Sequence, residues 1–551
     1  MNDKYVLILG AGLMQRPAIE AAKELGYKAL VVDANPNAVC APFADRFEPV
    51  DLKDKDRLAE LALSFGSRLA AVFTAGTDFS ASVSYVAEKC RLPAHSYEAA
   101  LNASDKIRMR GCFKENGVSS PEFSRISRRQ IASYLDPGVL GSISFPKVVK
   151  PADNMGARGC RLIRNGKEFL SAVEDAVRYS RSGTAILEDY MDGQEYSIDA
   201  LVYGGTLTIT GFADRHIFYP PYFIETGHTM PTSADESRKF ELIRTFAQGV
   251  KALGLTCGAA KADIKYTANG PMIGEIAARL SGGYMSGWTF PYASGLNLTK
   301  QALLIALGKI PEELLQYRNP LPISDAPFSV FEVPCPSASA ERAWISIPGT
   351  VSEVCNVDEA SGCPFIRNLF SRAGRGSRVD FPRNNVEKCG NAITASRDYA
   401  LAVDAAEDAV SRIVLRLEPD NRQTDVFLAR REKRAEAHFP PDAYLLSPAQ
   451  KDAFDALARS QVNIPRNEKT CALLSEKVKD FADTIKDYNH RSLLDTLRLF
   501  DSLCPEHPQL EGRKFWHALV RGGLQGILYV NDCALTERNQ LLRFSKKKRG
   551  R

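Results

Sequence analysis

The chain has 551 residues and a formal net charge of +5, with 44% hydrophobic and 25% charged residues. These values are typical of soluble globular proteins, and at about 150 residues per domain the length predicts three or four domains. No apolar stretch is long enough to span a bilayer, so no membrane partner is expected. The twelve cysteines form no Cys-x-x-Cys pair, which favours a reducing, cytoplasmic location over a disulfide framework or a zinc site.

The positive charge is concentrated at the C-terminus. Residues 538–551 contain seven Lys and Arg and no acid, so the remaining chain is nearly neutral. A solvated terminal tail explains this pattern better than a binding surface does. A nucleic-acid partner is therefore not expected.

Residues 1–100 alternate short apolar runs with helical periodicity, which predicts a Rossmann-like domain with a parallel sheet. The expected strands are 6–9, 29–32 and 70–73, and the expected helices are 13–25, 54–65 and 79–90. Gly10-Ala11-Gly12 and Asp33 imitate a dinucleotide fingerprint, but Gln15 stands where the third glycine belongs. The motif leaves open an anion or substrate site, a tight turn without a ligand, or, as a rival, an NAD-dependent oxidoreductase.

Residues 101–320 mix helices and strands, with helices expected over 235–253 and 297–307 and a hairpin turn at Gly204-Gly205. Five prolines over 319–340 indicate a linker. Residues 341–416 predict short strands and a helix at about 400–412, and a second linker is expected over 420–440. Apolar spacing then predicts helices over 448–459, 468–487 and 490–503.

Residues 106–279 contain the groups that a nucleotide triphosphate needs. Lys106 opens a helix after Asp105, and Lys150 ends a strand just before Pro151. A glycine-containing loop follows, with Gly156, Arg158 and Gly159. An acidic segment runs from Glu188 through Asp189 and Met191 to Glu195. Any one of these features alone indicates only a solvated side chain or a turn.

Asp263 and Glu275 lie on consecutive expected strands that are joined by the turn at 269–271. Alternation along paired strands can place both carboxylates on one face of the sheet. Two converging carboxylates suit Mg²⁺, which takes few protein ligands and shares phosphate oxygens.

In this order and spacing, the residues resemble the ATP-grasp superfamily, and within it the carboxylate–amine ligase group that includes L-amino acid ligases. The resemblance implies an α/β protein with a Rossmann-like pre-ATP-grasp domain over 1–100. An ATP-grasp domain of two α+β subdomains follows over 101–320, with the lid subdomain at about 120–187. A small β-rich C-terminal domain over 321–420 and a helical extension with a basic tail over 421–551 complete the expected fold.

The resemblance also assigns roles, with ATP and Mg²⁺ as the cofactors. Lys106 and Lys150 contact phosphates, the loop with Gly156, Arg158 and Gly159 covers them, and Glu188, Asp189 and Met191 surround the adenine. Glu195 accepts from the ribose, and Asp263 and Glu275 bind the metal. Arg279 faces the transferred phosphoryl group and the reacting carbonyl, and Ser281, Gly282 and Gly283 shape the carboxylate pocket. Glu225 and His228 position the amine or the metal, although His228 could equally be a simple loop histidine.

The expected activity joins a small-molecule carboxylate to an amine through an acyl phosphate, with release of ADP and phosphate. Ala277 departs from the family, which commonly has Asn there, and this favours the alternative of a catalytically degenerate ATP-binding regulatory or interaction protein. Residues 443–551 have no counterpart in the resemblance and could hold a protein partner or a second copy of the chain. Trp516, His517 and Tyr529 are expected in the core of this segment rather than in a site.

Overall fold

The computed structural model describes residues 3–429 and 439–549, and the chain forms two compact units. Unit 1 comprises Met1–Ile217, Pro221–Glu341 and Ala395–Ala402, and unit 2 comprises Phe218–Pro220, Arg342–Thr394 and Val403–Arg551. Residues 430–438 of the expected second linker and residues 550–551 of the basic tail lie outside the described residues. None of the described helices is long and apolar enough to cross a bilayer.

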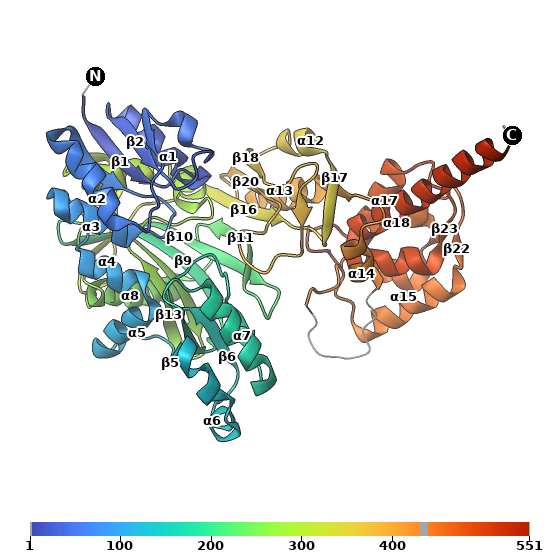
Figure 1. Ribbon diagram of the computed structural model, residues 1–551, viewed down its shortest axis with the longest axis horizontal. Coiled ribbons are helices and arrows are strands. Elements are labelled where there is room, and N and C mark those ends of the chain that lie inside the picture. The colour runs from blue at the N-terminus through green and yellow to red at the C-terminus, as the bar shows by residue number, and fades with distance from the viewer. Residues whose placement is uncertain (1–2, 430–438, 550–551) are drawn as a thin grey trace. The chain divides into compact units, whose positions relative to one another are not determined.

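Unit 1 begins with the expected parallel sheet (Figure 1). Its strand order is β3-β2-β1-β4, and every neighbouring pair is parallel. The strands are β1 (Tyr5–Leu9), β2 (Lys28–Val32), β3 (Arg46–Glu48) and β4 (Leu69–Phe73). The connecting helices are α1 (Arg16–Glu24), α2 (Lys55–Ser64) and α3 (Ser80–Cys90). Only β3, which is three residues long, was not predicted from the sequence.

A second, largely antiparallel sheet of unit 1 carries the candidate site residues Glu195, Glu225, His228, Asp263 and Glu275. Its strands run in the order β13-β12-β9-β10-β11, and β15 pairs parallel with β10. The strands are β9 (Gln194–Tyr203), β10 (Thr206–Phe218), β11 (Ile224–Met230), β12 (Gly258–Thr267), β13 (Gly270–Ala277) and β15 (Ser329–Glu332). The turn between β9 and β10 contains Gly204 and Gly205, both with positive φ, as the hairpin prediction requires.

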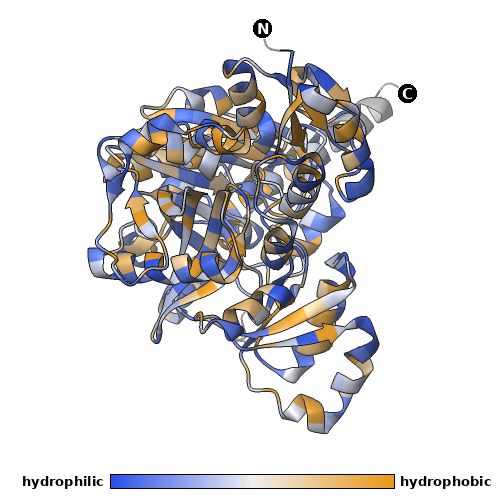
Figure 2. Cartoon of the chain, turned by 90° about the vertical axis from the view of Figure 1, so that its left-hand side faces the viewer, coloured by the Kyte–Doolittle hydropathy of each residue, from blue (hydrophilic) through white to orange (hydrophobic). Residues whose placement is uncertain are grey.

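Helices cover one face of this sheet with apolar side chains. Phe246 and Val250 of α8 (Glu236–Ala252) and Phe113 of α5 (Lys106–Glu115) belong to the same buried cluster as strand residues Ile198 and Ile273. Hydrophobic and hydrophilic residues alternate along such helices (Figure 2). One face of each helix can therefore be buried while the other meets water.

The segment over which the lid subdomain was expected contains a small antiparallel sheet in the order β5-β8-β6-β7. Its strands are β5 (Phe123–Ser127), β6 (Lys147–Pro151), β7 (Arg161–Ile163) and β8 (Thr184–Asp189). Helix α7 (Gly166–Tyr179) buries Phe169 and Val173 in the same cluster as Val149 of β6. This packing fixes the strand that ends in Lys150.

Unit 2 combines short strands with helices. Antiparallel pairs join β17 to β19 and β21, and β18 to β20. The strands are β17 (Gly349–Cys355), β18 (Ile366–Ser371), β19 (Arg378–Val379), β20 (Gly390–Ser396) and β21 (Val414–Leu417). The helices are α12 (Val357–Ser361), α13 (Tyr399–Arg412), α14 (Arg422–Ala429), α15 (Pro448–Ser460), α16 (Glu476–Ala482), α17 (Leu493–Leu503) and α18 (Gly512–Arg549).

One hydrophobic core runs through unit 2. Strand residues such as Val351 and Leu415 belong to the same buried cluster as Phe500, Trp516 and Tyr529 of the helices. The C-terminal helices are thus packed into the same core as the β-rich part of the unit. Trp516 and Tyr529 are buried, as expected for core residues.

One helical prediction in unit 2 was wrong, and another was confirmed with a later start. The expected helix over 468–487 is interrupted, because a short 3₁₀ turn (Thr470–Leu473) precedes α16, which starts after Ser475. The expected helix over 490–503 starts only at Leu493, because Ser492 caps it by accepting from the Asp495 N–H. Helix α18 was not predicted, and it contains a break at Gly523, where φ is 56°.

Candidate active site

A buried carboxylate between two cations lies where the lid strands meet α5. Lys150 Nζ, at the end of β6, lies 2.6 Å from Oε2 of Glu188 on the neighbouring β8. Arg110 Nη2 lies 2.9 Å from Oε1 of the same carboxylate and donates to the Gly274 carbonyl oxygen at 2.6 Å. All three side chains are largely buried, and Glu188 is 1% exposed.

The three charges stabilise one another. Burial alone would raise the pKa of Glu188, but the charges of Arg110 and Lys150 hold it below its usual range. Burial alone would lower the pKa of Lys150. The Glu188 carboxylate has the larger effect, so the pKa of Lys150 is raised. Arg110 was missed by the sequence analysis, although it lies one turn beyond Lys106 on the same helix.

Lys106 links the glycine-containing loop to a carboxylate of the larger sheet. It is the first residue of α5, which Asp105 caps by accepting from the N–H groups of Ile107 and Arg108. Lys106 Nζ donates to the Asn154 carbonyl oxygen at 2.9 Å and lies 3.4 Å from Oε2 of Glu275. The start of this helix therefore holds two separate parts of the site together.

The loop over 153–160 has a backbone that favours glycine. Gly156, Ala157 and Gly159 have φ values of 72°, 58° and 69°. A Cβ on Gly159 would lie 3.0 Å from Tyr179 Cδ2 and 3.2 Å from Pro151 Cγ, so this glycine also permits close packing. Arg158 lies inside the loop, where its Nε donates to the Met155 carbonyl oxygen at 3.2 Å.

The acidic segment between β8 and β9 is fixed against neighbouring strands. The Asp189 N–H donates to the Glu122 carbonyl oxygen at 3.0 Å, and the Asp189 side chain pairs with Lys147. The Met191 carbonyl oxygen accepts from Lys265 Nζ at 3.2 Å, and the same ammonium lies 3.6 Å from Glu195. The segment therefore presents Glu188 and Glu195 from well-anchored backbone.

Asp263 and Glu275 face each other on β12 and β13, where they are direct partners in the strand register. The structure thus brings together the two carboxylates that the sequence suggested as metal ligands. Burial would raise the pKa of Glu275, but Lys106, Lys261 and Arg279 lower it to about 2, so this carboxylate is ionised. Among the described residues, no group of three or more His, Cys, Asp or Glu side chains could hold a metal by itself.

These residues fit Mg²⁺ only when the ion also takes oxygens from a bound phosphate. Glu275 suits such an ion, because its one close cation, Lys106, is 3.4 Å away. Asp263 is less available to a metal ion, because a cation lies beside each of its oxygens. Its Oδ1 lies 2.6 Å from Arg215 Nη1, and its Oδ2 lies 2.5 Å from Lys261 Nζ.

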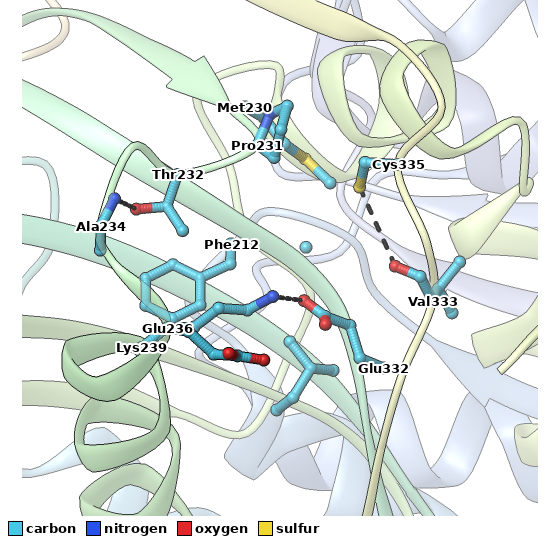
Figure 3. A pocket seen from close by; sticks show the side chains of 12 residues that line it. Phe212, Met230, Pro231, Thr232, Ala234, Glu236, Lys239, Glu332, Val333 and Cys335 are labelled. Atoms are coloured by element: carbon cyan, nitrogen blue, oxygen red, sulfur yellow. Dashed lines mark hydrogen bonds and ion pairs between the residues drawn. The ribbon is translucent and has the colours of Figure 1, made fainter. Parts of the chain in front are cut away.

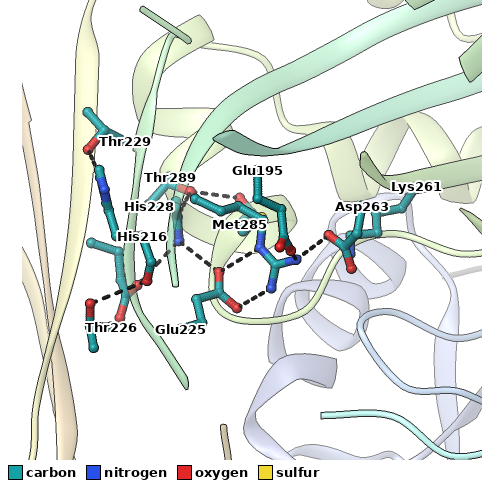
Figure 4. A network of polar contacts seen from close by, with 12 residues as sticks. Glu195, His216, Glu225, Thr226, His228, Thr229, Lys261, Asp263, Met285 and Thr289 are labelled. Atoms are coloured by element: carbon teal, nitrogen blue, oxygen red, sulfur yellow. Dashed lines mark hydrogen bonds and ion pairs between the residues drawn. The ribbon is translucent and has the colours of Figure 1, made fainter. Parts of the chain in front are cut away.

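Glu195, Glu225 and Asp263 lie in one polar network (Figure 4). All three form an ion pair with Arg215 of β10, which the sequence analysis missed. Its Nη1 lies 2.6 Å from Oε1 of Glu195 and 2.6 Å from Oδ1 of Asp263, and its Nη2 lies 2.8 Å from Oε2 of Glu225. Burial would lower the pKa of Arg215, but the three carboxylates raise it well above its usual value. One signal could have identified Arg215. It is an arginine in a strand whose other residues are mostly buried.

His228 of β11 is fully buried and lies beside the Arg215 cluster (Figure 4). Its Nε2 forms a hydrogen bond with Thr289 Oγ1 at 2.8 Å, and its Nδ1 lies 3.2 Å from Oε2 of Glu341. Glu225 is farther, 3.9 Å from Nδ1. His228 is therefore held at a defined place in the polar network and is not a mobile loop side chain.

The buried acid Asp199 anchors the turn that follows β13. Both the N–H and the Oγ–H of Ser281 donate to Oδ2 of Asp199, at 3.1 and 2.7 Å. Burial raises the pKa of Asp199 to about 6 despite these hydrogen bonds. Arg279 precedes this turn, where its Nη1 donates to the Leu280 carbonyl oxygen at 3.0 Å and its Nε lies 4.0 Å from Asp78.

The N-terminal glycine motif supports the same turn. Gln15 accepts from the Ala75 N–H at 2.9 Å and donates to Thr77 Oγ1 at 2.9 Å, which fixes the loop after β4. Gly76 of that loop lies against the turn, because a Cβ there would be 3.1 Å from Gly282 Cα. The Gly10–Gly12 region is thus a structural turn that positions the expected carboxylate pocket.

Asp33 closes the glycine loop on itself. Its Oδ2 accepts from the Ala11 N–H at 2.8 Å, and its Oδ1 accepts from the Asn35 N–H at 2.9 Å. A dinucleotide fingerprint needs this acid for the ribose hydroxyls. These contacts and Gln15 favour a tight turn over an NAD site.

A separate cavity of about 270 Å³ lies elsewhere in unit 1 (Figure 3). Phe212, Met230 and Val333 give it an apolar wall, and Lys239 and Glu332 form an ion pair of 2.5 Å at its side. None of the expected nucleotide-site residues lines it.

Comparison with known proteins agrees with this geometry. The family model of the ATP-grasp domain matches residues 143–287, and that of the L-amino acid ligase C-terminal domain 2 matches residues 343–418. Carnosine synthase 1 from Gallus gallus is 25% identical over 334 residues, which cover 56% of this chain and 36% of that protein. The chain thus matches little more than a third of the length of this curated relative.

Solved structures show the same fold. An L-amino acid ligase from Bacillus licheniformis superposes with a TM-score of 0.63 at 18% identity, over 76% of this chain and all of that one. A phosphoribosylglycinamide synthetase from Anaerococcus prevotii gives 0.56 at 19% identity, over 75% of this chain and all of that one. Residues 143–287 therefore match an ATP-grasp domain and residues 343–418 match the L-amino acid ligase C-terminal domain 2, and the chain shares the fold of these solved structures.

Proposed function

We propose that the chain is an ATP-dependent carboxylate–amine ligase that forms an amide or peptide bond through an acyl phosphate. The observation that carries the proposal is that Lys106 contacts both the loop over 153–160 and Glu275. A phosphate chain bound beside this ammonium would meet the covering loop on one side and a metal-binding carboxylate on the other.

The nucleotide is bound by groups from helix α5, from the loop over 153–160 and from strands of both antiparallel sheets. Lys106 and Lys150 neutralise phosphate oxygens, and the loop with Gly156, Arg158 and Gly159 covers them. Glu188, Asp189 and Met191 surround the adenine, and Glu195 accepts from the ribose. Glu275, with Asp263 beside it, would hold Mg²⁺, which would neutralise charge on the phosphates.

The acid substrate lies against Arg279 and the turn at Ser281, Gly282 and Gly283. Its carboxylate attacks the γ-phosphorus of ATP in line, the bond to the β-phosphate oxygen breaks, and ADP leaves. Arg279, Lys106 and Lys150 stabilise the negative charge on the transferred group. The loop over 153–160 excludes water, which would hydrolyse the acyl phosphate.

The amine enters on the side of Glu225 and His228. It attacks the acyl carbon, phosphate leaves, and a C–N bond forms. The similarity to proteins named carnosine synthase and L-amino acid ligase supports amino acids as substrates. All twelve cysteines are free thiols, which supports the cytoplasm as the working compartment.

The test is release of ADP and phosphate from Mg-ATP with pools of amino acids and small carboxylates, with and without amines. Release that requires one acid and one amine is expected. Lys150→Ala and Glu275→Ala should each abolish release while circular dichroism shows a folded protein. Full activity of both variants would refute the site assignment.

Ala277 supports a second candidate, an ATP-binding regulatory or interaction protein without turnover. Its methyl group is buried and offers no ligand where the related ligases commonly carry Asn. ATP binding without ADP release, for every acid and amine pair, would favour this candidate. Residues 443–551 would then be the place to look for a protein partner or a second copy of the chain.

A further inference from the structure

Lys261 and Ala277 are direct partners in the register of β12 and β13. On the same two strands, Asp263 faces Glu275. Because residues two apart on a strand point to the same face, all four side chains share one surface of the sheet. Ala277 has no polar atom in its side chain. Lys261 is therefore the polar member of this pair, next to the pair of Asp263 and Glu275.

Lys261 is directed at Asp263. Its Nζ lies 2.5 Å from Oδ2, and the Lys261 and Asp263 side chains are only 13% and 21% exposed. Arg215, which is 9% exposed, takes the other oxygen at 2.6 Å. Both oxygens of Asp263 therefore contact fixed cations, and a partly buried pair of this kind is screened little by solvent.

Glu275 differs from Asp263 in this respect. Among the described residues, the Lys106 ammonium is the one cation within ion-pair distance of Glu275, at 3.4 Å, and Lys261 and Arg279 act on this carboxylate from farther away. The Lys106 ammonium also has the Asn154 carbonyl oxygen as an acceptor at 2.9 Å. Glu275 is therefore the carboxylate that can turn to a metal ion with the least loss of existing contacts.

We propose that Lys261 supplies at Asp263 the positive charge that a second divalent cation would otherwise supply, so that the site takes a single Mg²⁺ held by Glu275 and the nucleotide phosphates. Mg²⁺ requires about six ligands in near-octahedral geometry. A second ion would find no side-chain oxygen at Ala277 and would have to displace two cations from Asp263. The inference rests on the proposed nucleotide site, and it makes Lys261 a further residue of that site.

The test counts metal ions per bound nucleotide. The full-length chain, in excess over a non-hydrolysable imido analogue of ATP, is titrated with Mn²⁺, and free Mn²⁺ is followed by its electron paramagnetic resonance signal. Wild type should bind one Mn²⁺ per nucleotide. The Lys261→Gln/Ala277→Asn variant, which removes the cation from Oδ2 of Asp263 and adds an amide oxygen, should bind two.

A matched control is Lys239→Gln. Lys239 forms an ion pair with Glu332 at the same distance of 2.5 Å but lies outside the nucleotide site, so this variant should still bind one Mn²⁺. Two ions in wild type would overturn the inference. One ion in a double variant that binds the analogue as tightly as wild type would also overturn it.

Calorimetric titration with the analogue separates this inference from the proposed function. If the wild type binds no nucleotide, the proposed function fails and the inference fails with it. If the double variant does not fold, Lys261→Gln alone replaces it. The Asp263 oxygen that has lost Lys261 should then weaken binding of the Mg-bound analogue at least tenfold in low free Mg²⁺, with recovery as free Mg²⁺ rises. No such dependence on free Mg²⁺ would overturn the inference.

Discussion

The Lys150 ammonium lies 2.6 Å from Oε2 of Glu188, on a neighbouring strand of the lid sheet. Because Arg110 contacts the other oxygen, one buried acid balances two cations. Glu188→Gln should leave both cations without a counter-charge and lower the free energy of unfolding by about 3 kcal/mol. Urea denaturation measures this loss, and calorimetry should show weaker nucleotide binding.

The control for this substitution is Glu98→Gln. Glu98 forms an ion pair with Arg108 at the surface, where its side chain is 71% exposed. Such exposed pairs contribute little to stability. If the two variants lose the same free energy of unfolding, the ion pairs of Glu188 with Arg110 and Lys150 do not stabilise the fold more than a surface pair does.

Asp199 should make stability depend on pH. Its pKa is raised to about 6 by burial, above the usual value of about 3.9. A raised pKa disfavours the ionised form in the folded state, so the folded state loses stability as pH rises from about 4 to about 6. Asp199→Asn should remove this loss and stabilise the protein at pH 7 by up to about 3 kcal/mol.

Thermal melting between pH 4 and pH 8 measures this difference. Asp199→Asn should gain stability relative to wild type at pH 7 but not at pH 4. Asp325→Asn, which changes an exposed acid paired with Arg244, should follow the wild-type pH profile. Parallel profiles for wild type and Asp199→Asn would contradict the prediction.

Gly193, the glycine of the segment between β8 and β9, should not tolerate a side chain. Its φ is 140°, and a Cβ there would lie 2.1 Å from the Tyr266 carbonyl oxygen. Gly193→Ala should therefore lower the free energy of unfolding by at least about 3 kcal/mol and weaken nucleotide binding. Gly204→Ala is the matched control, because Gly204 also has a positive φ, 56°, but no atom within 4 Å. It should cost only about 1 kcal/mol.

Gln15→Ala should affect the acid substrate more than ATP. Gln15 holds the loop after β4, and Gly76 of that loop lies against Gly282 in the expected carboxylate pocket. We expect the KM for the acid to rise about tenfold, which corresponds to about 1.4 kcal/mol, with little change in the KM for ATP. Equal changes in both KM values would indicate general destabilisation instead.

Removal of residues 421–551 should unfold the rest of unit 2. Phe500 and Trp516 belong to the same core as Val351 and Leu415, so truncation would expose that apolar surface to water. Limited proteolysis should cut the truncated chain within 342–418 and leave the full-length chain intact there. Resistance of both chains would show that the β-rich part folds alone.

Regular patterns made much of the fold predictable. The strands β1, β2 and β4 and the helices α8, α10 (Leu298–Ala306) and α13 follow apolar periodicities that the sequence shows directly. The helix expected over 468–487 was wrong, because apolar spacing does not reveal where a cap such as Ser475 interrupts a helix. Helix α18 was missed because its buried residues pack on several sides and give no single apolar stripe.

The candidate site was predictable where residues follow one another along the chain. Lys106 lies near Glu275, Lys150 lies near Glu188, and Asp263 faces Glu275. Arg110 and Arg215 were missed, because their importance comes from ion pairs with residues on other strands. Lys261 was missed although its partner Asp263 is only two residues away on the same strand. Such pairings depend on strand register, which one sequence does not specify.

The ion pairs of Arg215 have a consequence for the protein without nucleotide. Glu195, Glu225 and Asp263 converge on one guanidinium, so their mutual repulsion is already relieved inside the chain. Many metal-dependent proteins unfold in chelators because the ion holds like charges together. Here the internal cation fills that role, and the protein should keep its fold and melting temperature in EDTA.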